Sequence, residues 1–307
     1  MIAVTDWKTS FRATVIGALA GAAIGLLAFF FLTSGQHQAM GGVLFLLVPV
    51  LAGCSIAIVA RRPNSVVVAS ALLSVLCSLV LLIALGKEGV LCAVLAFPIM
   101  VAGPAIGVAI GFLVRKLIVN RAANPTTPTG LLLLLAPMLV VAGERVERPL
   151  LEHPRIETIQ TAIEVNDSLE HVWRNILTVD SVHAAKPMLM YVGLPIPQRC
   201  TMQGRGVGAK RTCYFNVGYI EETVTVWTPP YLLGLSIDRT HMPGRHWLGF
   251  KCAEYHLESK GPMTLLTRTT TVTSNLAPSW YWRRFECLGV ESEHRYILQD
   301  IARRAER

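Results

Sequence analysis

The sequence has little charge for its length. Asp, Glu, Lys and Arg make up 16% of its 307 residues, whereas an ordinary globular chain carries about 25%. The shortage is confined to one half: residues 1–150 hold ten basic and four acidic side chains, and residues 151–307 hold eighteen and sixteen. This composition excludes a single soluble domain, a disordered chain and a small secreted disulfide scaffold. The excess of basic residues lies beside apolar segments, so we expect no nucleic-acid surface.

Asp, Glu, Lys, Arg and His are also missing from four long apolar runs in the first half. Each run is close to the 20 or so residues that a membrane-spanning helix requires, so we predict four transmembrane helices. Pumps and ion-coupled transporters use charged residues within the membrane, and their absence argues against those classes. The runs lie near residues 13–32, 43–60, 66–85 and 90–114.

A fifth apolar run, at 127–143, is shorter and contains Pro137. No charge occurs between Arg121 and Glu144, so this run either crosses the membrane, which we favour, or forms a re-entrant segment. If the helices alternate in direction, the Lys and Arg of the short loops lie on one side of the membrane, and only Lys87 lies on the other. The amino terminus is then cytoplasmic at a plasma or inner membrane. With a fifth crossing the carboxy-terminal domain is extracytoplasmic, and without it that domain is cytoplasmic.

Glycines recur at intervals of four in the first and fourth runs. This spacing places them on one helix face and lets two helix backbones approach closely. We favour packing inside the bundle, with a homo-oligomer formed through these faces as the alternative. The glycines are Gly17, Gly21, Gly25, Gly103, Gly107 and Gly111.

A charged linker at 144–155 separates the membrane region, 1–143, from a domain at 156–307. In this domain short runs of alternating apolar and polar residues are bounded by Gly, Pro and Asn, which is typical of strands joined by turns. We predict strands at 156–165, 188–193, 199–203, 211–217, 219–227, 232–239, 248–258 and 263–274, and helices at 168–177 and from 279 nearly to the end.

The terminal helix has one apolar face. Val290, His294, Ile297 and Ile301 recur at spacings of four, three and four, which indicates that they are buried together. Beside a meander of strands, such a helix predicts an α+β fold in which a curved antiparallel sheet wraps around it. We expect an apolar cavity between the sheet and the helix.

Several segments of this domain, taken in order, resemble the SRPBCC superfamily. The similarity is to its START-like, polyketide cyclase/dehydrase-like branch, which has the helix-grip fold, and it covers roughly residues 155–306. The segments are Val172-Trp173, Gly193 to Pro197, Gly206 to Arg211 with Cys213 and Phe215, Glu222, Trp227 to Pro230, Tyr281-Trp282 and His294.

The resemblance implies a domain that encloses a hydrophobic small molecule such as a lipid, isoprenoid or polyketide. This superfamily mixes binders with enzymes and has no common catalytic triad, so the resemblance assigns no catalytic residue and no cofactor. The candidates for lining the cavity are Arg211, Phe215, Glu222, Tyr281, Trp282, Val290, His294 and Ile297.

Arg211 and Glu222 form the most informative charged pair. If Asn216 and Val217 make a hairpin loop, residue 211 faces residue 222 on the face that also carries Phe215. The pair is either a structural cross-strand ion pair or a polar anchor for a ligand headgroup.

The other candidates have alternative roles as well. His294 lies on the apolar helix face, where a hydrogen-bonded core histidine is more common than an acid or base. Tyr281 and Trp282 begin the terminal helix, where they either pack, guard the cavity mouth or touch the membrane surface.

The segment Gly204 to Ala209 matches G-x-G-x-x-A, but a strand follows it where a dinucleotide site requires a helix. We interpret it as a hairpin turn. Cys200 and Cys213 are equidistant from its centre and would face each other in a regular hairpin. We favour a bulge in this glycine-rich turn, which would shift the register and keep the two thiols apart. The alternative is a regular register, which in an oxidising compartment would permit a disulfide.

Motifs of nucleophilic, redox and nucleotide chemistry are absent: the chain has no G-x-S-x-G, C-x-x-C or Walker sequence. His241 and His246 lack further ligands, so we expect no metal. Three hypotheses remain. The favoured one is a membrane-anchored module that binds a hydrophobic small molecule or lipid at the bilayer surface; the others are a cyclase or dehydratase acting on an apolar substrate, and a membrane scaffold or regulator.

Overall fold

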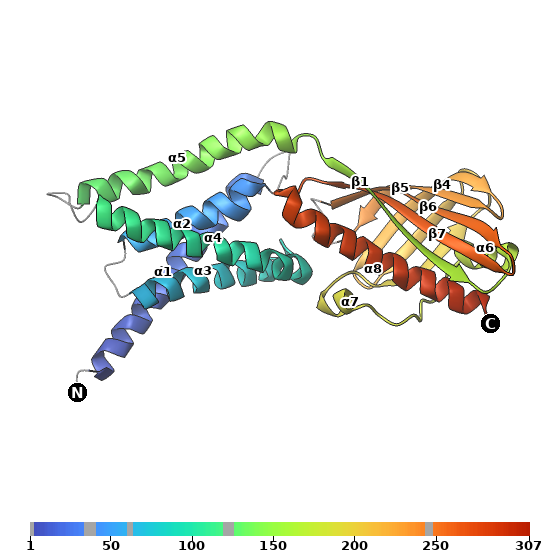
Figure 1. The fold of residues 1–307 in the computed structure, drawn as a ribbon, viewed down its shortest axis with the longest axis horizontal. Coiled ribbons are helices and arrows are strands. Elements are labelled where there is room, and N and C mark those ends of the chain that lie inside the picture. Colours follow the sequence, from blue (N-terminus) through green and yellow to red (C-terminus); the bar gives the residue numbers. More distant parts are fainter. Residues whose placement is uncertain (1–2, 34–40, 60–63, 119–125, 243–247) are drawn as a thin grey trace. The chain divides into compact units, whose positions relative to one another are not determined.

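The computed structural model describes residues 3–33, 41–59, 64–118, 126–242 and 248–307. Two positions used in the sequence analysis, Arg121 and His246, lie outside the described residues. The chain divides into two compact units, one made of Met1–His153 with Asn275–Pro278 and the other of Pro154–Ser274 with Ser279–Arg307 (Figure 1).

The first unit consists of helices. Three of them contain stretches long and apolar enough to cross a membrane, at Ser10–Thr33, Ser65–Ala84 and Val90–Leu117, whereas Val43–Val59 is apolar but shorter. The second predicted span is thus the least extended of the first four. The helices are α1 (Ala3–Thr33), the π-helix η1 (Val43–Leu47), α2 (Val48–Val59), α3 (Asn64–Ala84), α4 (Val90–Leu117) and α5 (Thr126–Leu151).

Both glycine faces pack within this unit. A Cβ atom on Gly21 of α1 would lie 2.8 Å from the Cβ of Ser74 in α3. A Cβ atom on Gly107 of α4 would lie 2.0 Å from the carbonyl oxygen of Val50 in α2. Only glycine permits such approaches. The glycines at intervals of four therefore allow close helix packing inside the bundle, which is the role that we favour from the sequence.

Helix α5 is longer than the predicted apolar run and extends to Leu151, through most of the residues predicted as a linker. Glu and Arg are good helix formers, and Arg148 pairs with Glu144 one turn earlier. The carboxylate of Glu147 accepts hydrogen bonds from the backbone N–H groups of Gly42, at 2.5 Å, and Val43, at 3.0 Å. The end of α5 therefore lies beside the first turn of η1.

The second unit is a seven-stranded antiparallel sheet with three helices (Figure 1). The strand order is β1-β7-β6-β5-β4-β3-β2, and the long terminal helix α8 packs on the sheet, as expected for a helix-grip domain. The strands are β1 (Arg155–Val165), β2 (Pro197–Gln203), β3 (Lys210–Phe215), β4 (Gly218–Thr228), β5 (Leu232–His241), β6 (Leu248–Lys260) and β7 (Met263–Ser274). The helices are α6 (Leu169–Leu177), α7 (Met188–Val192) and α8 (Ser279–Ala305).

The strand predicted at 188–193 is wrong: Met188–Val192 form the short helix α7 instead. Pro187 precedes its first turn, and Gly193, with φ of 125°, ends it. A run of five or six apolar residues fits one buried strand or one helical turn equally well, so periodicity does not separate the two.

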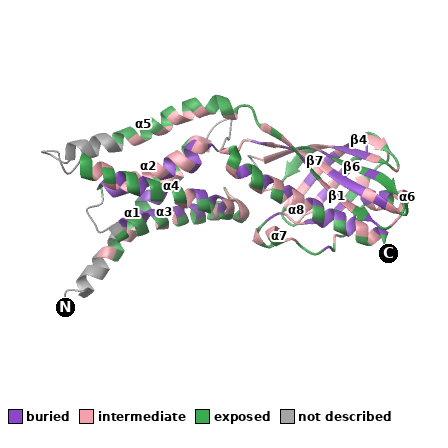
Figure 2. Cartoon of the chain, viewed as in Figure 1, coloured by how far each residue is buried: buried purple, intermediate pink, exposed green. Residues whose placement is uncertain are grey.

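The core of this unit lies between the sheet and α8 (Figure 2). The predicted helix face is confirmed, since Val290, His294, Ile297 and Ile301 are all buried. On the sheet a bulge interrupts β4 between Val224 and Val226. As a result Trp227 packs against the core, with its ring centroid 5.4 Å from that of Trp173.

Candidate functional site

Arg211 and Glu222 face each other inside the domain, as the hairpin arithmetic predicts. The loop pairs Phe215 with Gly218 and Arg211 with Glu222. Arg211 Nη1 donates to Glu222 Oε2 at 3.1 Å, and the two side chains are 3% and 7% exposed. Burial raises the pKa of the Glu222 carboxyl, while the positive charges of Arg211 and Arg268 oppose this rise. Burial disfavours the charged form of a carboxyl, and nearby positive charges favour it.

A second, partly buried ion pair lies nearby. Arg268 of β7 donates through Nη1 to Glu293 of α8 at 3.2 Å. The ring of Tyr255 connects the two pairs, because the Cζ atoms of Arg268 and Arg211 lie 5.4 Å and 5.9 Å from its centroid. These are cation–π distances, so the ring helps to hold both charges in a low-dielectric interior.

Three residues of this site, Arg268, Tyr255 and Glu293, were not predicted from the sequence. A signal for Arg268 was present, because it shares the parity of Leu266 and Val272, two fully buried residues of the same strand. A charge at an inward position of an apolar strand is uncommon enough to mark a site. Glu293 and Tyr255 carry no comparable signal.

Each of the two arginines keeps one polar atom without a partner. Among the described residues neither Nε of Arg211 nor Nε of Arg268 has a hydrogen-bond partner, although both atoms are buried. An unsatisfied buried donor costs about 1–3 kcal/mol, and more when it is charged. The interior therefore offers two unused donors, which an acceptor group could satisfy.

His294 belongs to the core rather than to a reactive set. Its Nε2 lies 2.7 Å from the hydroxyl of Thr270, and its Nδ1 lies 3.1 Å from the hydroxyl of Thr161. Burial, together with the charge of Arg268, lowers the pKa of the ring to about 2. The imidazole is thus neutral with both nitrogens engaged, which supports the structural interpretation over the acid–base one.

The structure does not gather the remaining candidates around the arginines. Phe215 packs on a cluster around the two cysteines of β2 and β3, and Val290 packs with residues of β1 and β7. Ile297 belongs to the main core together with Tyr255. The rings of Tyr281 and Trp282 lie 5.2 Å apart at the start of α8, where Trp282 is buried.

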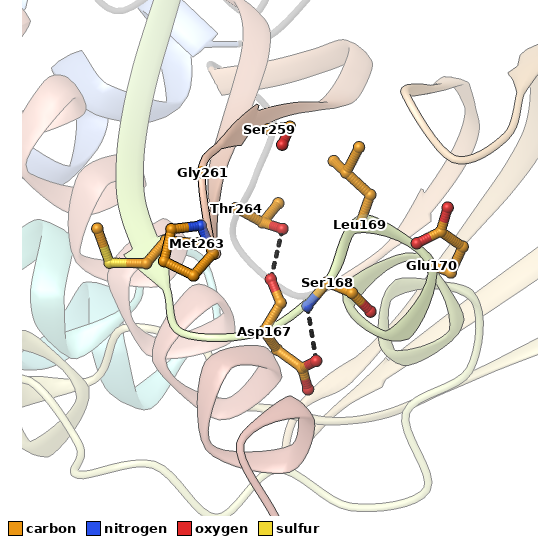
Figure 3. Close-up of a pocket in the computed structure, with 9 residues that line it drawn as sticks. Asp167, Ser168, Leu169, Glu170, Ser259, Gly261, Met263 and Thr264 are labelled. Carbon is orange, nitrogen blue, oxygen red and sulfur yellow. Dashed lines mark hydrogen bonds between the residues drawn. The ribbon is translucent and has the colours of Figure 1, made fainter.

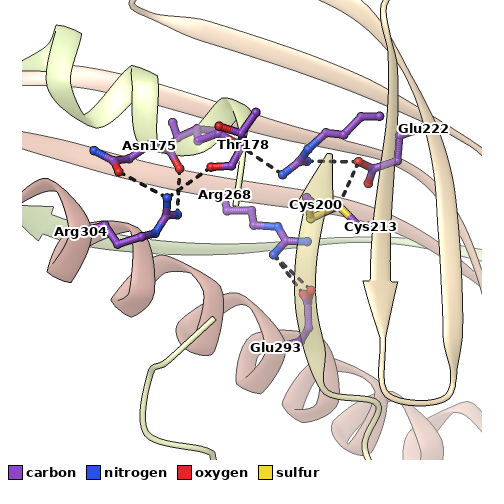
Figure 4. The surroundings of a disulfide bond; sticks show 10 residues. Asn175, Thr178, Cys200, Cys213, Glu222, Arg268, Glu293 and Arg304 are labelled. Atoms are coloured by element: carbon purple, nitrogen blue, oxygen red, sulfur yellow. Dashed lines mark hydrogen bonds and ion pairs between the residues drawn. A yellow bond between two sulfur atoms is a disulfide. The ribbon is translucent and has the colours of Figure 1, made fainter. Parts of the chain in front are cut away.

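A disulfide joins Cys200 to Cys213 beside this site (Figure 4). The two residues are register partners with Cα atoms 4.1 Å apart, which confirms that they face each other. The predicted disturbance of the glycine-rich turn is wrong, because the irregularity of this hairpin lies instead between Pro197 and Arg199. The Sγ atom of Cys213 lies 3.7 Å from Glu222 Oε2, so the disulfide borders the first ion pair.

A surface pocket of about 270 Å³ lies where the start of α6 meets the turn between β6 and β7 (Figure 3). Its walls are held together by Thr264 Oγ1, which donates to the carbonyl oxygen of Asp167 at 2.7 Å. None of the predicted site residues lines it. Within the part of the chain that the structure describes, no group of three or more His, Cys, Asp or Glu could hold a metal ion.

No protein-family model matches the chain, and no curated protein matches it. Solved structures similar to half of it include the Zhui aromatase/cyclase from Streptomyces sp. R1128, at 15% identity and a TM-score of 0.36, covering 50% of this chain and 95% of that one. Norcoclaurine synthase from Thalictrum flavum, in complex with dopamine and hydroxybenzaldehyde, is similar at 13% identity and a TM-score of 0.34, covering 50% and 88%. A protein from Arthrobacter aurescens is similar at 18% identity and a TM-score of 0.35, covering 48% and 86%.

Proposed function

We propose that this protein is a membrane-anchored helix-grip domain that binds a hydrophobic small molecule or lipid at the bilayer surface. The observation that carries the proposal is the pair of buried, unpartnered Nε atoms of Arg211 and Arg268 within an apolar core. A ligand with an apolar body and one acceptor group would bury its body against this core. Its acceptor would satisfy donors that the described residues leave free.

The charges of the site favour a carboxylate, phosphate or phenolate as that acceptor. Two arginines face two glutamates, and the pKa of Glu222 is raised by burial. When Glu222 is protonated, the set carries one net positive charge. Guanidinium groups bind such oxygen acceptors strongly because the hydrogen bond is assisted by charge.

Membrane anchoring is supported by the outer surface of the first unit. Apolar side chains of α1 that would be unfavourable in water are more than half exposed, as lipid-facing side chains are. They include Phe11, Ile16, Leu19, Leu27 and Phe31.

The position of α5 supports a fifth crossing. If the amino terminus is cytoplasmic, α1 leads outward and η1 starts on the outer side. Glu147, near the end of α5, binds the N–H groups of Gly42 and Val43 there, so α5 would end on the outer side as well. The disulfide between Cys200 and Cys213 fits this topology, because disulfides persist in oxidising compartments.

The binding proposal is tested on the full-length protein purified in mild detergent. Native mass spectrometry identifies any retained molecule, and titration with a fluorescent fatty acid measures affinity. The variant Arg268→Met removes the whole guanidinium, including Nε and the ion pair with Glu293, at similar side-chain volume. We expect it to bind the probe about tenfold to a hundredfold more weakly, the effect of losing a charged hydrogen bond.

The matched control is Arg295→Met, which removes an arginine that is 64% exposed on the same helix as Glu293. It should bind the probe as the unmodified protein does. If the unmodified protein neither retains a molecule nor binds the probe, or if both variants bind equally well, the proposal is wrong.

A further inference from the structure

At one corner of the helix-grip domain, the first residue of β1 contacts both β7 and α8. Arg155, the first residue of β1, pairs with Ser274, the last residue of β7, and forms an ion pair with Glu286 of α8. The hydroxyl of Ser274 also donates to Glu286 Oε1, at 2.5 Å. The beginning of β1, the end of β7 and the first turns of α8 are therefore linked by side-chain and backbone contacts.

A short link joins this corner to helix α5. Three residues separate Leu151, the last residue of α5, from Arg155. A chain of this length spans at most about 14 Å. If α5 crosses the bilayer, as the proposed function requires, the eight helical residues from Glu144 to Leu151 add about 12 Å, so the corner lies at most about 26 Å from the end of the apolar run.

The exposed side chains of this corner have the composition of a membrane interface. Trp280, in the first turn of α8, is 68% exposed, and Ile156 of β1 is 59% exposed. Arg284 and Leu288 follow Trp280 at intervals of four and are both exposed, so the three residues form one stripe on α8. An indole ring, a guanidinium and an aliphatic side chain on one face are typical of helices that lie in the headgroup region.

We propose that the stripe of Trp280, Arg284 and Leu288 docks on the phospholipid headgroups of the membrane that anchors the chain; this rests on the membrane location in the proposed function. The indole would lie at the level of the glycerol groups, and the guanidinium would bind lipid phosphate. Docking orients the domain so that the aromatic end of α8 faces the bilayer from which a hydrophobic ligand would come.

Fluorescence quenching by brominated lipid tests this docking. The full-length protein is placed in nanodiscs of phosphatidylcholine, either unlabelled or brominated on the acyl chains close to the ester groups. The fluorescence of Trp280 is obtained by subtracting the emission of the variant Trp280→Phe from that of the unmodified protein. We expect this Trp280 emission to be mostly quenched in brominated nanodiscs. The difference for Trp227→Phe, a tryptophan that packs against the core, should keep its intensity.

A positive control is Phe31→Trp, which places an indole on an exposed apolar position of α1 and should be quenched. If Phe31→Trp is quenched and the Trp280 difference is not, the docking proposal is wrong. Fatty-acid binding is measured on the same samples. Quenching without any probe binding would support the docking surface while contradicting the ligand-binding proposal, so the two failures are distinguishable.

Discussion

The charged residues inside the sheet contribute little to stability by themselves. Replacing a buried ion pair by apolar residues of similar volume is often neutral or stabilising, because desolvation offsets the attraction. Here two such pairs surround Tyr255, and each arginine retains an unpartnered Nε. A role in binding accounts for this arrangement better than a role in folding does.

His294 is expected to make the protein sensitive to acid. The native ring is neutral, with its pKa lowered to about 2, so the unfolded chain binds the proton more readily. Stability is then complete above the unfolded pKa of about 6.5 and falls as the pH drops below it, by about 2 kcal/mol at pH 5. Thermal or urea unfolding of the full-length protein between pH 5 and pH 8 measures this loss.

The comparison for His294 is the variant His294→Gln, whose amide can bond to both threonine hydroxyls but does not titrate. Between pH 8 and pH 5 its free energy of unfolding should fall by about 2 kcal/mol less than that of the unmodified protein. Equal pH dependence in both proteins would show that the histidine titrates normally and is accessible to protons.

At the scale of elements, the hairpin of β2 and β3 is held both by its turn and by the disulfide. Gly204, Gly206 and Gly208 all have positive φ, which lets the chain reverse while the cysteines stay in register. Removing the bond in the double variant Cys200→Ala/Cys213→Ala should lower the free energy of unfolding by about 2–4 kcal/mol. Urea titration measures this change.

The control for the disulfide is Cys252→Ala, which removes a free cysteine of β6. Alkylation without reductant, on protein taken directly from membranes, shows whether the bond exists in the cell. Complete alkylation of both Cys200 and Cys213 would contradict the bond and would remove one argument for an extracytoplasmic domain.

For the whole molecule, the topology makes the sharpest prediction. A reporter fused after Arg307 should behave as extracytoplasmic, and one fused after Arg121 as cytoplasmic, because the loop charges fall on one side and α5 ends beside the start of η1. Paired enzymatic reporters active on opposite sides of the membrane measure this. Cytoplasmic behaviour of both fusions would mean that α5 does not cross.

Features set by neighbours in the sequence could be predicted from it. The register that pairs Arg211 with Glu222 follows from the length of its turn, and the buried face of α8 follows from helical spacing. The packing role of the glycines follows from their interval of four. In each case the feature is determined by residues that are close together in the sequence.

Other features depend on contacts between distant residues, and only the tertiary structure decided them. Arg268, Tyr255 and Glu293 come from β7, β6 and α8, and no local pattern shows that their side chains meet. Residues Met188–Val192 form a helix where a strand was predicted, and α5 continues past its apolar run to Leu151. Packing overrides local preference where a segment is short, and side chains from separate elements share a site only when the fold brings them together.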